Sequence, residues 1–306
     1  MSKSTFILGT RGSPLAMAQT RLVAAALEAA HGWAEGTVGL RIVTTSGDRI
    51  QDRPLAEIGG KALWTKELDL ALLAGETQAS VHSMKDVESE RPEALAIAAM
   101  LPRADVRDRL IGADSIAALP NGAKVGSSSP RRAAQLKRLR PDLVIVPIRG
   151  NVDTRLAKRE AGEVDATLLA AAGLNRLGRE AIGVALSVDD ILPAPAQGAV
   201  GIECRAGDEA TLALLRAIDH RDTHDRVSAE RAFTRALGGT CHSPVAALAT
   251  IDGDALLLRV EILSTDGAEH VTDEARFARG DLAGPAALAT AMLVTAPVSI
   301  RRLFEA

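Results

Sequence analysis

The same strand–turn–helix pattern occurs twice in this chain of 306 residues, and it restricts the fold more than any other feature. In the first copy, an apolar run at 6–8 leads into a turn with two glycines, and Ser13 suits the N-cap of a helix over 14–30 that begins with proline. In the second copy, 124–130 reads KVGSSSP, which places Ser129 as the N-cap before another proline. Two such units predict two α/β domains of similar construction.

The stretch 80–87, with the sequence SVHSMKDV, contains the candidate catalytic residue. A buried strand at 79–81 would deliver Asp86, just beyond its end, into a cleft, with Lys85 beside it. Ligands of open α/β sheets bind at the carboxyl ends of the strands. We therefore expect Asp86 to be a catalytic carboxylate. The alternative is that Lys85 and Asp86 only decorate an exposed loop.

Arginines stand at both helix starts and at the end of another strand. Arg11 lies in the first glycine turn, where free backbone NH groups favour an anion. Arg131 and Arg132 open the second helix, although the helix dipole disfavours positive charge there. An apolar strand at 143–148, suited to a parallel sheet covered on both faces, ends at Arg149. We interpret these arginines as a clamp for carboxylate or phosphate groups; the alternative for the pair is two solvated side chains on an exposed turn.

The composition argues against several classes of protein. With 47% hydrophobic and 25% charged residues, the chain suits a globular protein of two or three domains. A net charge of −3 and a scarcity of aromatic residues argue against a nucleic-acid partner. No apolar run reaches the roughly 20 residues of a membrane span, and the first residues lack the apolar core of a signal peptide. We expect a cytoplasmic protein without a membrane partner.

The two cysteines, Cys204 and Cys241, are too few and too far apart for a disulfide scaffold or a zinc site, and no metal is expected. Cys204 lies in an apolar run and is most simply a buried core thiol. Cys241 lies in the glycine-bracketed loop GGTCHSPV, a setting that suits a reactive thiol, with an inert cysteine as the alternative. The adjacent His242 lacks the third member that a Cys–His nucleophile needs.

The last third of the chain has a different pattern from the first two. A helix over 225–237 ends at two glycines, and two Asp-Gly pairs then separate apolar runs. We expect a three-stranded antiparallel sheet covered by a helix at 282–294, which together form a small α+β domain. In the first domain, the polar span 47–60 is long enough to form a mobile lid over a site, before a helix at 62–73.

Nine motifs in one order make the chain resemble the porphobilinogen deaminase family over nearly its whole length. These are ILGTRGSPLAMAQ, TTSGD, GGKALWTKEL, VHSMKDV, VGSSSPRRAAQL, IRGNVDTRL, LPAPAQGAVGIECR, ERAFTRAL and GGTCHSPV. The resemblance implies an α/β fold of three domains: two lobes like those of type II periplasmic binding proteins, joined by a double hinge crossing, and a small C-terminal α+β domain. The crossings match 101–104 and 192–197. The expected domains are 1–101 with 196–218 (domain 1), 102–195 (domain 2) and 219–306 (domain 3).

The resemblance also implies roles for individual residues. Cys241 would hold a dipyrromethane cofactor through a thioether bond, a primer that the enzyme makes from its own substrate. Asp86 would contact pyrrole NH groups, assist the loss of ammonia and stabilise a cationic intermediate. The remaining cofactor-binding residues would be Ser83, Lys85, Asp48, Ser127, Ser128, Ser129, Arg131, Arg132 and Arg155. The substrate-binding residues would be Arg11, Ser13, Gln19, Arg149 and Arg176.

The activity implied by the resemblance is that of a transferase in tetrapyrrole and heme biosynthesis. Such an enzyme polymerises four porphobilinogen molecules head to tail, with loss of ammonia, and releases hydroxymethylbilane; the resemblance favours a monomer. Because each porphobilinogen carries two carboxylates, the growing chain accumulates negative charge that guanidinium groups can bind in bidentate fashion. Glu57, Trp64 and Thr240 depart from residues common in the family. From the two lobes alone, the alternative function is an anion-binding protein without catalysis.

Overall fold

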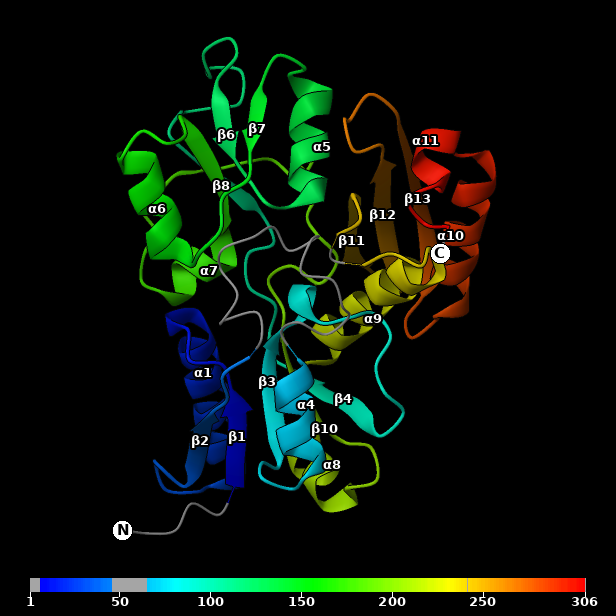
Figure 1. Ribbon diagram of the computed structural model, residues 1–306. Helices are drawn as coiled ribbons and strands as arrows, with labels where there is room; N and C mark the ends of the chain where they lie inside the picture. Colours follow the sequence, from blue (N-terminus) through cyan, green and yellow to red (C-terminus); the bar gives the residue numbers. More distant parts are fainter. Residues whose placement is uncertain (1–5, 46–64, 241, 306) are drawn as a thin grey trace. The chain divides into compact units, whose positions relative to one another are not determined.

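The computed structural model describes residues 6–45, 65–240 and 242–305 (Figure 1). The chain divides into two compact units, which are Met1–Ala104 with Gly198–His224 and Asp105–Gln197 with Asp225–Ala306. It passes from the first unit to the second after Ala104, returns after Gln197 and passes to the second again after His224. The division does not separate the C-terminal segment, so the limits of the three expected domains stay a prediction. The expected lid at 47–60 lies outside the described residues.

The first unit is built on a five-stranded sheet in the order β2-β1-β3-β10-β4. Its strands are β1 (Phe6–Thr10), β2 (Val38–Ile42), β3 (Ala79–Ser83), β4 (Leu95–Met100) and β10 (Val200–Arg205). β1 runs parallel to β2 and β3, whereas β10 runs antiparallel to β3 and to β4. β3 is therefore the central strand, and a single 3₁₀ turn, η1 (Met84–Asp86), follows its carboxyl end.

Three α-helices accompany this sheet in the described part of the first unit: α1 (Pro14–His31), α4 (Lys66–Leu73) and α8 (Glu209–Arg216). The predicted N-cap of α1 is confirmed, because Ser13 Oγ accepts the backbone NH of Ala16 at 3.3 Å. Gly32 ends the helix at φ 62°, a left-handed conformation that glycine adopts without strain. The buried core includes Leu8, Val23, Leu27, Ile202, Leu215 and Cys204, which confirms Cys204 as a core thiol.

The second unit contains a sheet of the same design, in the order β7-β6-β8-β5-β9. Its strands are β5 (Asp108–Ile111), β6 (Lys124–Gly126), β7 (Val144–Val146), β8 (Ala166–Ala170) and β9 (Val184–Ala185), and its helices are α5 (Pro130–Leu139), α6 (Val152–Glu160) and α7 (Ala171–Arg176). β6 runs parallel to β7 and β8, and β5 runs antiparallel to β8, so the strand pattern of the first unit is repeated. The prediction of two similar α/β sheets is confirmed.

One strand prediction in this sheet is wrong. The apolar run 143–148 was expected to form a strand covered on both faces, but only Val144–Val146 is extended, and β7 is an edge strand with β6 as its neighbour. Val144 is half exposed, at 47%. The apolar side chains at the two ends, Leu143 and Ile148, are buried outside the strand, which explains why the run appeared continuous in sequence.

The C-terminal part of the second unit forms the expected antiparallel meander, in the order β11-β12-β13. It consists of β11 (Val245–Asp252), β12 (Ala255–Leu263), β13 (His270–Ala278), α9 (Arg221–Ala236), α10 (Ala283–Thr295) and α11 (Val298–Arg301). Both Asp-Gly pairs lie at hairpin turns, where Gly253 and Gly267 have φ angles of 62° and 73°. The fully buried Phe233 of α9 packs in the core against this sheet.

A buried carboxylate connects α9 to the return crossing and to β11. Glu230 is fully buried, and its two oxygens accept the backbone NH groups of Ala196 (2.6 Å) and Ala249 (2.7 Å). Ala196 has φ 62°, an unfavourable angle for a residue with a β-carbon. Glu230 therefore holds a strained segment of the crossing against the C-terminal sheet.

Replacing Glu230 by Gln should lower the free energy of unfolding by about 1–3 kcal/mol, because an amide NH₂ would face a backbone NH that has lost its acceptor. Urea denaturation monitored by circular dichroism measures the change. The exposed Glu35 offers a matched control, and Glu35→Gln should stay within about 0.5 kcal/mol of wild type. Equal stability of Glu230→Gln and wild type would contradict this role.

Candidate active site

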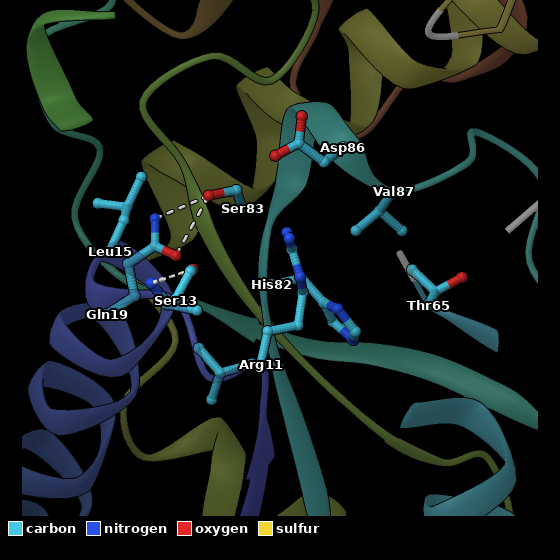
Figure 2. Close-up of a pocket in the computed structure, with 11 residues that line it drawn as sticks. Arg11, Ser13, Leu15, Gln19, Thr65, His82, Ser83, Asp86 and Val87 are labelled. Atoms are coloured by element: carbon cyan, nitrogen blue, oxygen red, sulfur yellow. Dashed lines mark hydrogen bonds between the residues drawn. The ribbon is translucent and has the colours of Figure 1, made fainter. Parts of the chain in front are cut away.

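A pocket in the first unit collects side chains from segments far apart in the sequence (Figure 2). The turn after β1 and the first turns of α1 form one wall, β3 and η1 form another, and the residue before α4 completes the lining. The lining residues are Arg11, Ser13, Leu15, Ala16, Gln19, Thr65, Val81, His82, Ser83, Asp86 and Val87.

Five residues predicted from the sequence line this pocket together: Arg11, Ser13, Gln19, Ser83 and Asp86. The side chains of Gln19 and Ser83 join α1 to the end of β3, since Gln19 Nε2 donates to Ser83 Oγ at 2.8 Å and Ser83 Oγ lies 3.2 Å from Gln19 Oε1 (Figure 2). Lys85 is half-buried beside Asp86 but is not one of the lining residues.

The charges in the pocket are sparse. Asp86 is the one carboxylate among the described lining residues, and Arg11 is the one arginine. Figure 2 shows Asp86 beyond the end of β3, above His82. The N-terminus of α1, which favours anions, lies on the same pocket through Ser13, Leu15 and Ala16. The pocket can therefore receive a ligand that carries an anionic group and a centre of positive charge.

In the second unit, Arg131 and Arg132 are buried around Asp108, at the start of β5. Arg132 makes two bonds to this carboxylate, from Nη2 to Oδ1 (2.6 Å) and from Nε to Oδ2 (3.1 Å), and Arg131 Nη2 donates to Oδ2 at 2.8 Å. Arg131 also donates from Nη1 to the backbone oxygen of Leu192 at 2.7 Å. Burial alone would raise the pKa of Asp108, but the two guanidinium groups outweigh it and hold that pKa far below its ordinary value.

The alternative of two solvated arginines is therefore wrong. The two side chains are 3% and 8% exposed. Asp108 supplies the negative charge that offsets two cations at a helix N-terminus. Sequence reasoning missed Asp108. The available signal was an acidic residue opening the apolar strand sequence DRLI, which together with two unexplained arginines indicates a buried ion pair.

The other predicted residues of the second unit lie around the starts of α5 and α6 and at the end of α7. Ser129 Oγ accepts the NH of Arg132 as the helix N-cap, and Ser128 Oγ donates to the backbone oxygen of Ile148 at 2.6 Å. Ser127 is buried, and its Oγ accepts the NH of Ser129 at 3.2 Å.

The remaining arginines are each partly buried. Arg149 follows the segment after β7, and Arg155 Nε donates to the backbone oxygen of Gly150 at 3.0 Å. Arg176 ends α7, and burial lowers its pKa to about 10. The structure thus brings the serines and arginines of the second unit onto neighbouring helix and strand ends. Their roles toward a ligand stay predictions.

Several residues singled out in the sequence lie outside the described residues: Asp48, Glu57, Trp64 and Cys241. Beside Cys241, the NH of Thr240 donates to Ser243 Oγ at 3.1 Å, and the NH of His242 donates to Thr240 Oγ1 at 3.1 Å. Burial lowers the pKa of His242, whereas it raises the pKa of the core thiol Cys204 to about 11. Cys204 is therefore a poor nucleophile.

The part of the chain that the structure describes contains neither a group of side chains that could hold a metal ion nor a membrane-spanning helix. Three or more His, Cys, Asp or Glu side chains do not come together there as they would around a metal ion. The described helices are also too short or too polar to span a bilayer.

Comparison with known proteins gives matches over nearly the whole chain. Residues 6–213 match the family model "Porphobilinogen deaminase, dipyromethane cofactor binding domain", and residues 225–293 match "Porphobilinogen deaminase, C-terminal domain". The porphobilinogen deaminase of Sphingopyxis alaskensis is 58% identical over 303 residues, covering 97% of this chain and 96% of its own. That of Paracoccus denitrificans is 51% identical over 288 residues, covering 93% and 90%.

The similarity to solved structures of other proteins is lower. The second substrate-binding domain of Lactococcus lactis GlnP, in an open conformation, is 10% identical, covers 78% of this chain and 92% of its own, and gives a TM-score of 0.41. The VFT2 domain of Bordetella pertussis BvgS is 16% identical, covers 70% and 86%, and gives a TM-score of 0.38.

Replacing Asp108 by Asn should lower the free energy of unfolding at neutral pH by about 3–5 kcal/mol, because two buried guanidinium groups would lose their counter-charge. Since the folded-state pKa of Asp108 lies below its ordinary value of 3.8, its contribution is present above that value and is lost as the pH falls below it. The urea midpoint should therefore fall less steeply with acidification in the variant than in wild type.

The exposed Asp114 of the same unit provides the control for this experiment. Asp114→Asn should keep both the wild-type midpoint and its pH dependence. If Asp108→Asn were as stable as wild type at neutral pH, the ion cluster would not be the reason that the two arginines are tolerated.

Proposed function

The chain belongs to the porphobilinogen deaminase family, and on that premise we propose that Asp86 is the carboxylate that stabilises the positive charge formed on a pyrrole during its reaction. The enzyme is a transferase of tetrapyrrole biosynthesis. It polymerises porphobilinogen head to tail, with loss of ammonia, on a dipyrromethane cofactor and releases the linear tetrapyrrole hydroxymethylbilane.

The position of Asp86 carries the proposal. It is the one carboxylate among the described residues that line the pocket, it stands at the end of the central strand, and Arg11 lies in the same pocket. Loss of ammonia from the aminomethyl group leaves a positive charge on the pyrrole, and a fixed negative charge facing it lowers the energy of that state. The Gln19–Ser83 hydrogen bonds hold the wall next to Asp86 in place.

Arg11 is proposed to bind a carboxylate of the incoming substrate, helped by Ser13, Gln19 and the N-terminus of α1. A guanidinium group that binds an acetate or propionate would place the pyrrole ring against Asp86 without neutralising it. Arg149 and Arg176 of the second unit are proposed to bind other carboxylates of substrate and growing chain.

Residues of the second unit fit a cofactor that bears several carboxylates. The cluster of Arg131, Arg132 and Asp108 contains one more cation than anion, and Arg131 Nε is buried without a hydrogen-bond partner among the described residues. We propose that Arg131, Arg132, Arg155, Ser127, Ser128 and Ser129 bind the carboxylates of dipyrromethane, together with Asp48, Ser83 and Lys85. When bound, dipyrromethane supplies the pyrrole carbon to which the first substrate is joined.

Cys241 is the proposed attachment point of the cofactor. The proposal follows the family resemblance, in which the cysteine of the loop motif GGTCHSPV holds the cofactor. The other cysteine, Cys204, is a poor candidate, because burial raises the pKa of its thiol to about 11. We also propose that the enzyme is a monomer that acts in the cytoplasm, on the basis of its family. The alternative of an anion-binding protein without catalysis is not favoured, because both family models match the chain.

Replacing Asp86 by Asn should lower kcat at least about 100-fold, because a neutral amide cannot offset the positive charge on the pyrrole. Hydroxymethylbilane formation from porphobilinogen measures the loss, and circular dichroism should show an intact fold. Glu90→Gln changes an exposed carboxylate in the following loop and should keep wild-type turnover. Wild-type turnover in Asp86→Asn would remove Asp86 from this role.

Replacing Cys241 by Ala should give a protein with the mass of the bare chain, whereas wild type should carry the additional mass of two linked pyrroles. Intact-protein mass spectrometry makes the comparison. Cys204→Ala, at the buried cysteine, should retain the additional mass. If Cys241→Ala kept the additional mass, the cofactor would be attached elsewhere.

A further inference from the structure

Five ionisable side chains of the first unit meet directly behind the pocket. These are Asp69 on α4, His82 on β3, Glu88 and Arg91 after η1, and Glu203 on β10, here called the Glu203 cluster. The side chain of Glu203 is fully buried, and those of His82 and Arg91 are 4% and 9% exposed. His82 also lines the pocket, so the cluster reaches the candidate active site directly.

Arg91 binds Glu203 with two parallel hydrogen bonds. Its Nε donates to Oε1 at 2.8 Å and its Nη2 donates to Oε2 at 2.8 Å, which is the bidentate geometry that gives an arginine–carboxylate pair its directional strength. Arg91 Nη2 also donates to Asp69 Oδ1 at 2.6 Å, and Nη1 donates to Glu88 Oε2 at 3.0 Å. The segment that follows Asp86 is therefore fastened to the middle of β10.

The segment that precedes Asp86 contacts the same carboxylate. His82 Nε2 lies 3.2 Å from Glu203 Oε2, a contact that is an ion pair when the imidazole is protonated. Burial would raise the pKa of Glu203, but its contacts with His82 and Arg91 outweigh burial and lower that pKa to about 2. Glu203 is thus held as an anion between two partners that flank Asp86 in the chain.

β10 also supports the turn itself. The backbone NH of Met84, in η1, donates to the oxygen of Ala199 at 3.1 Å. The side chain of Met84 is 1% exposed and occupies the space above Gly201, where an added β-carbon would lie 2.1 Å from its sulfur. Residues on both sides of Asp86, and the turn that contains it, therefore contact β10 or Ala199, the residue before it.

The cluster is a costly way to stabilise a core. It holds three carboxylates against one guanidinium and one imidazole, and burial raises the pKa of Asp69 in spite of Arg91. Well-packed apolar side chains would commonly give equal or greater stability in such a position. Charged groups with fixed hydrogen-bond directions, in contrast, favour one arrangement of the chain. In this cluster they fix residues that lie just before and just after Asp86 in the sequence.

We propose that Glu203 is a positioning residue for Asp86, acting through His82 on one side of the turn and Arg91 on the other. The proposal rests on the proposed role of Asp86. A carboxylate displaced by about 1 Å from a developing charge loses much of its effect, and such a displacement can lower a rate about 100-fold. Glu203 does not touch the substrate, so its loss should affect turnover more than substrate affinity.

The test is Glu203→Gln in the holoenzyme, which keeps the size of the side chain and removes its charge. We expect kcat to fall about 10- to 100-fold, with the KM for porphobilinogen within about twofold of wild type. Adding Glu203→Gln to Asp86→Asn should give no further loss, because the carboxylate that it positions is already absent. Leu215→Ala, in the core of the same unit, should lower stability without changing kcat per folded molecule.

A second variant keeps the test decisive if Glu203→Gln does not fold. His82→Leu releases one side of the turn, and we expect a lower kcat with unchanged KM. A higher KM with unchanged kcat would instead make His82 a substrate contact and overturn the proposal, as would wild-type kcat in folded Glu203→Gln. Wild-type turnover in Asp86→Asn would overturn the proposed role of Asp86. Reduced turnover in Asp86→Asn together with wild-type turnover in Glu203→Gln would overturn only the positioning role of Glu203.

Discussion

In both α/β sheets, the strand that runs antiparallel to the central strand carries a buried carboxylate paired with arginine. In the first unit this is Glu203 on β10, which binds Arg91, and in the second it is Asp108 on β5, which binds Arg131 and Arg132. Each carboxylate would be unstable alone in the interior and is retained because guanidinium groups from other elements reach it. The pair in the first unit lies beside the turn that carries Asp86, and the pair in the second unit includes two of the candidate ligand-binding residues, Arg131 and Arg132.

The side chains around Asp108 (Arg131 and Arg132) carry a net positive charge, whereas the Glu203 cluster carries a net negative charge. This difference suits a reaction with polyanionic reactants and a cationic transition state. The Asp108 cluster contains an excess of cations, as binding of several carboxylates requires. The Glu203 cluster contains an excess of anions behind the pocket with Asp86, where a positive charge would form. In the proposed mechanism, the surplus of positive charge in the second unit would serve the bound carboxylates, and the surplus of negative charge in the first unit would lie near the cation.

The C-terminal sheet is tied to the second unit by polar contacts as well as by packing. Gln135 of α5 donates to Glu261 of β12 at 2.7 Å and accepts from Arg131 at 2.9 Å, so a hydrogen-bond chain runs from the C-terminal sheet to Asp108. At the same end of the meander, Gly267 in the turn between β12 and β13 packs against the backbone of α5, where a β-carbon would lie 2.2 Å from the oxygen of Ala134. The contacts that fix β12 therefore also fix the Asp108 cluster of α5.

The sequence alone determined the local structure and the chemistry of the reactants. Ser13 and Ser129 before prolines gave the helix starts, the Asp-Gly pairs gave the hairpins, and the motif order gave the family, because these features depend on residues close together in the chain. Only the tertiary structure decided which charges are buried and which residues share a pocket. Asp108 and Glu203 reach partners on strands and helices that are remote in sequence, and no local pattern specifies such contacts. The sequence therefore predicted an anion for Arg131 and Arg132 but could not identify the carboxylate of Asp108 as their partner within the chain.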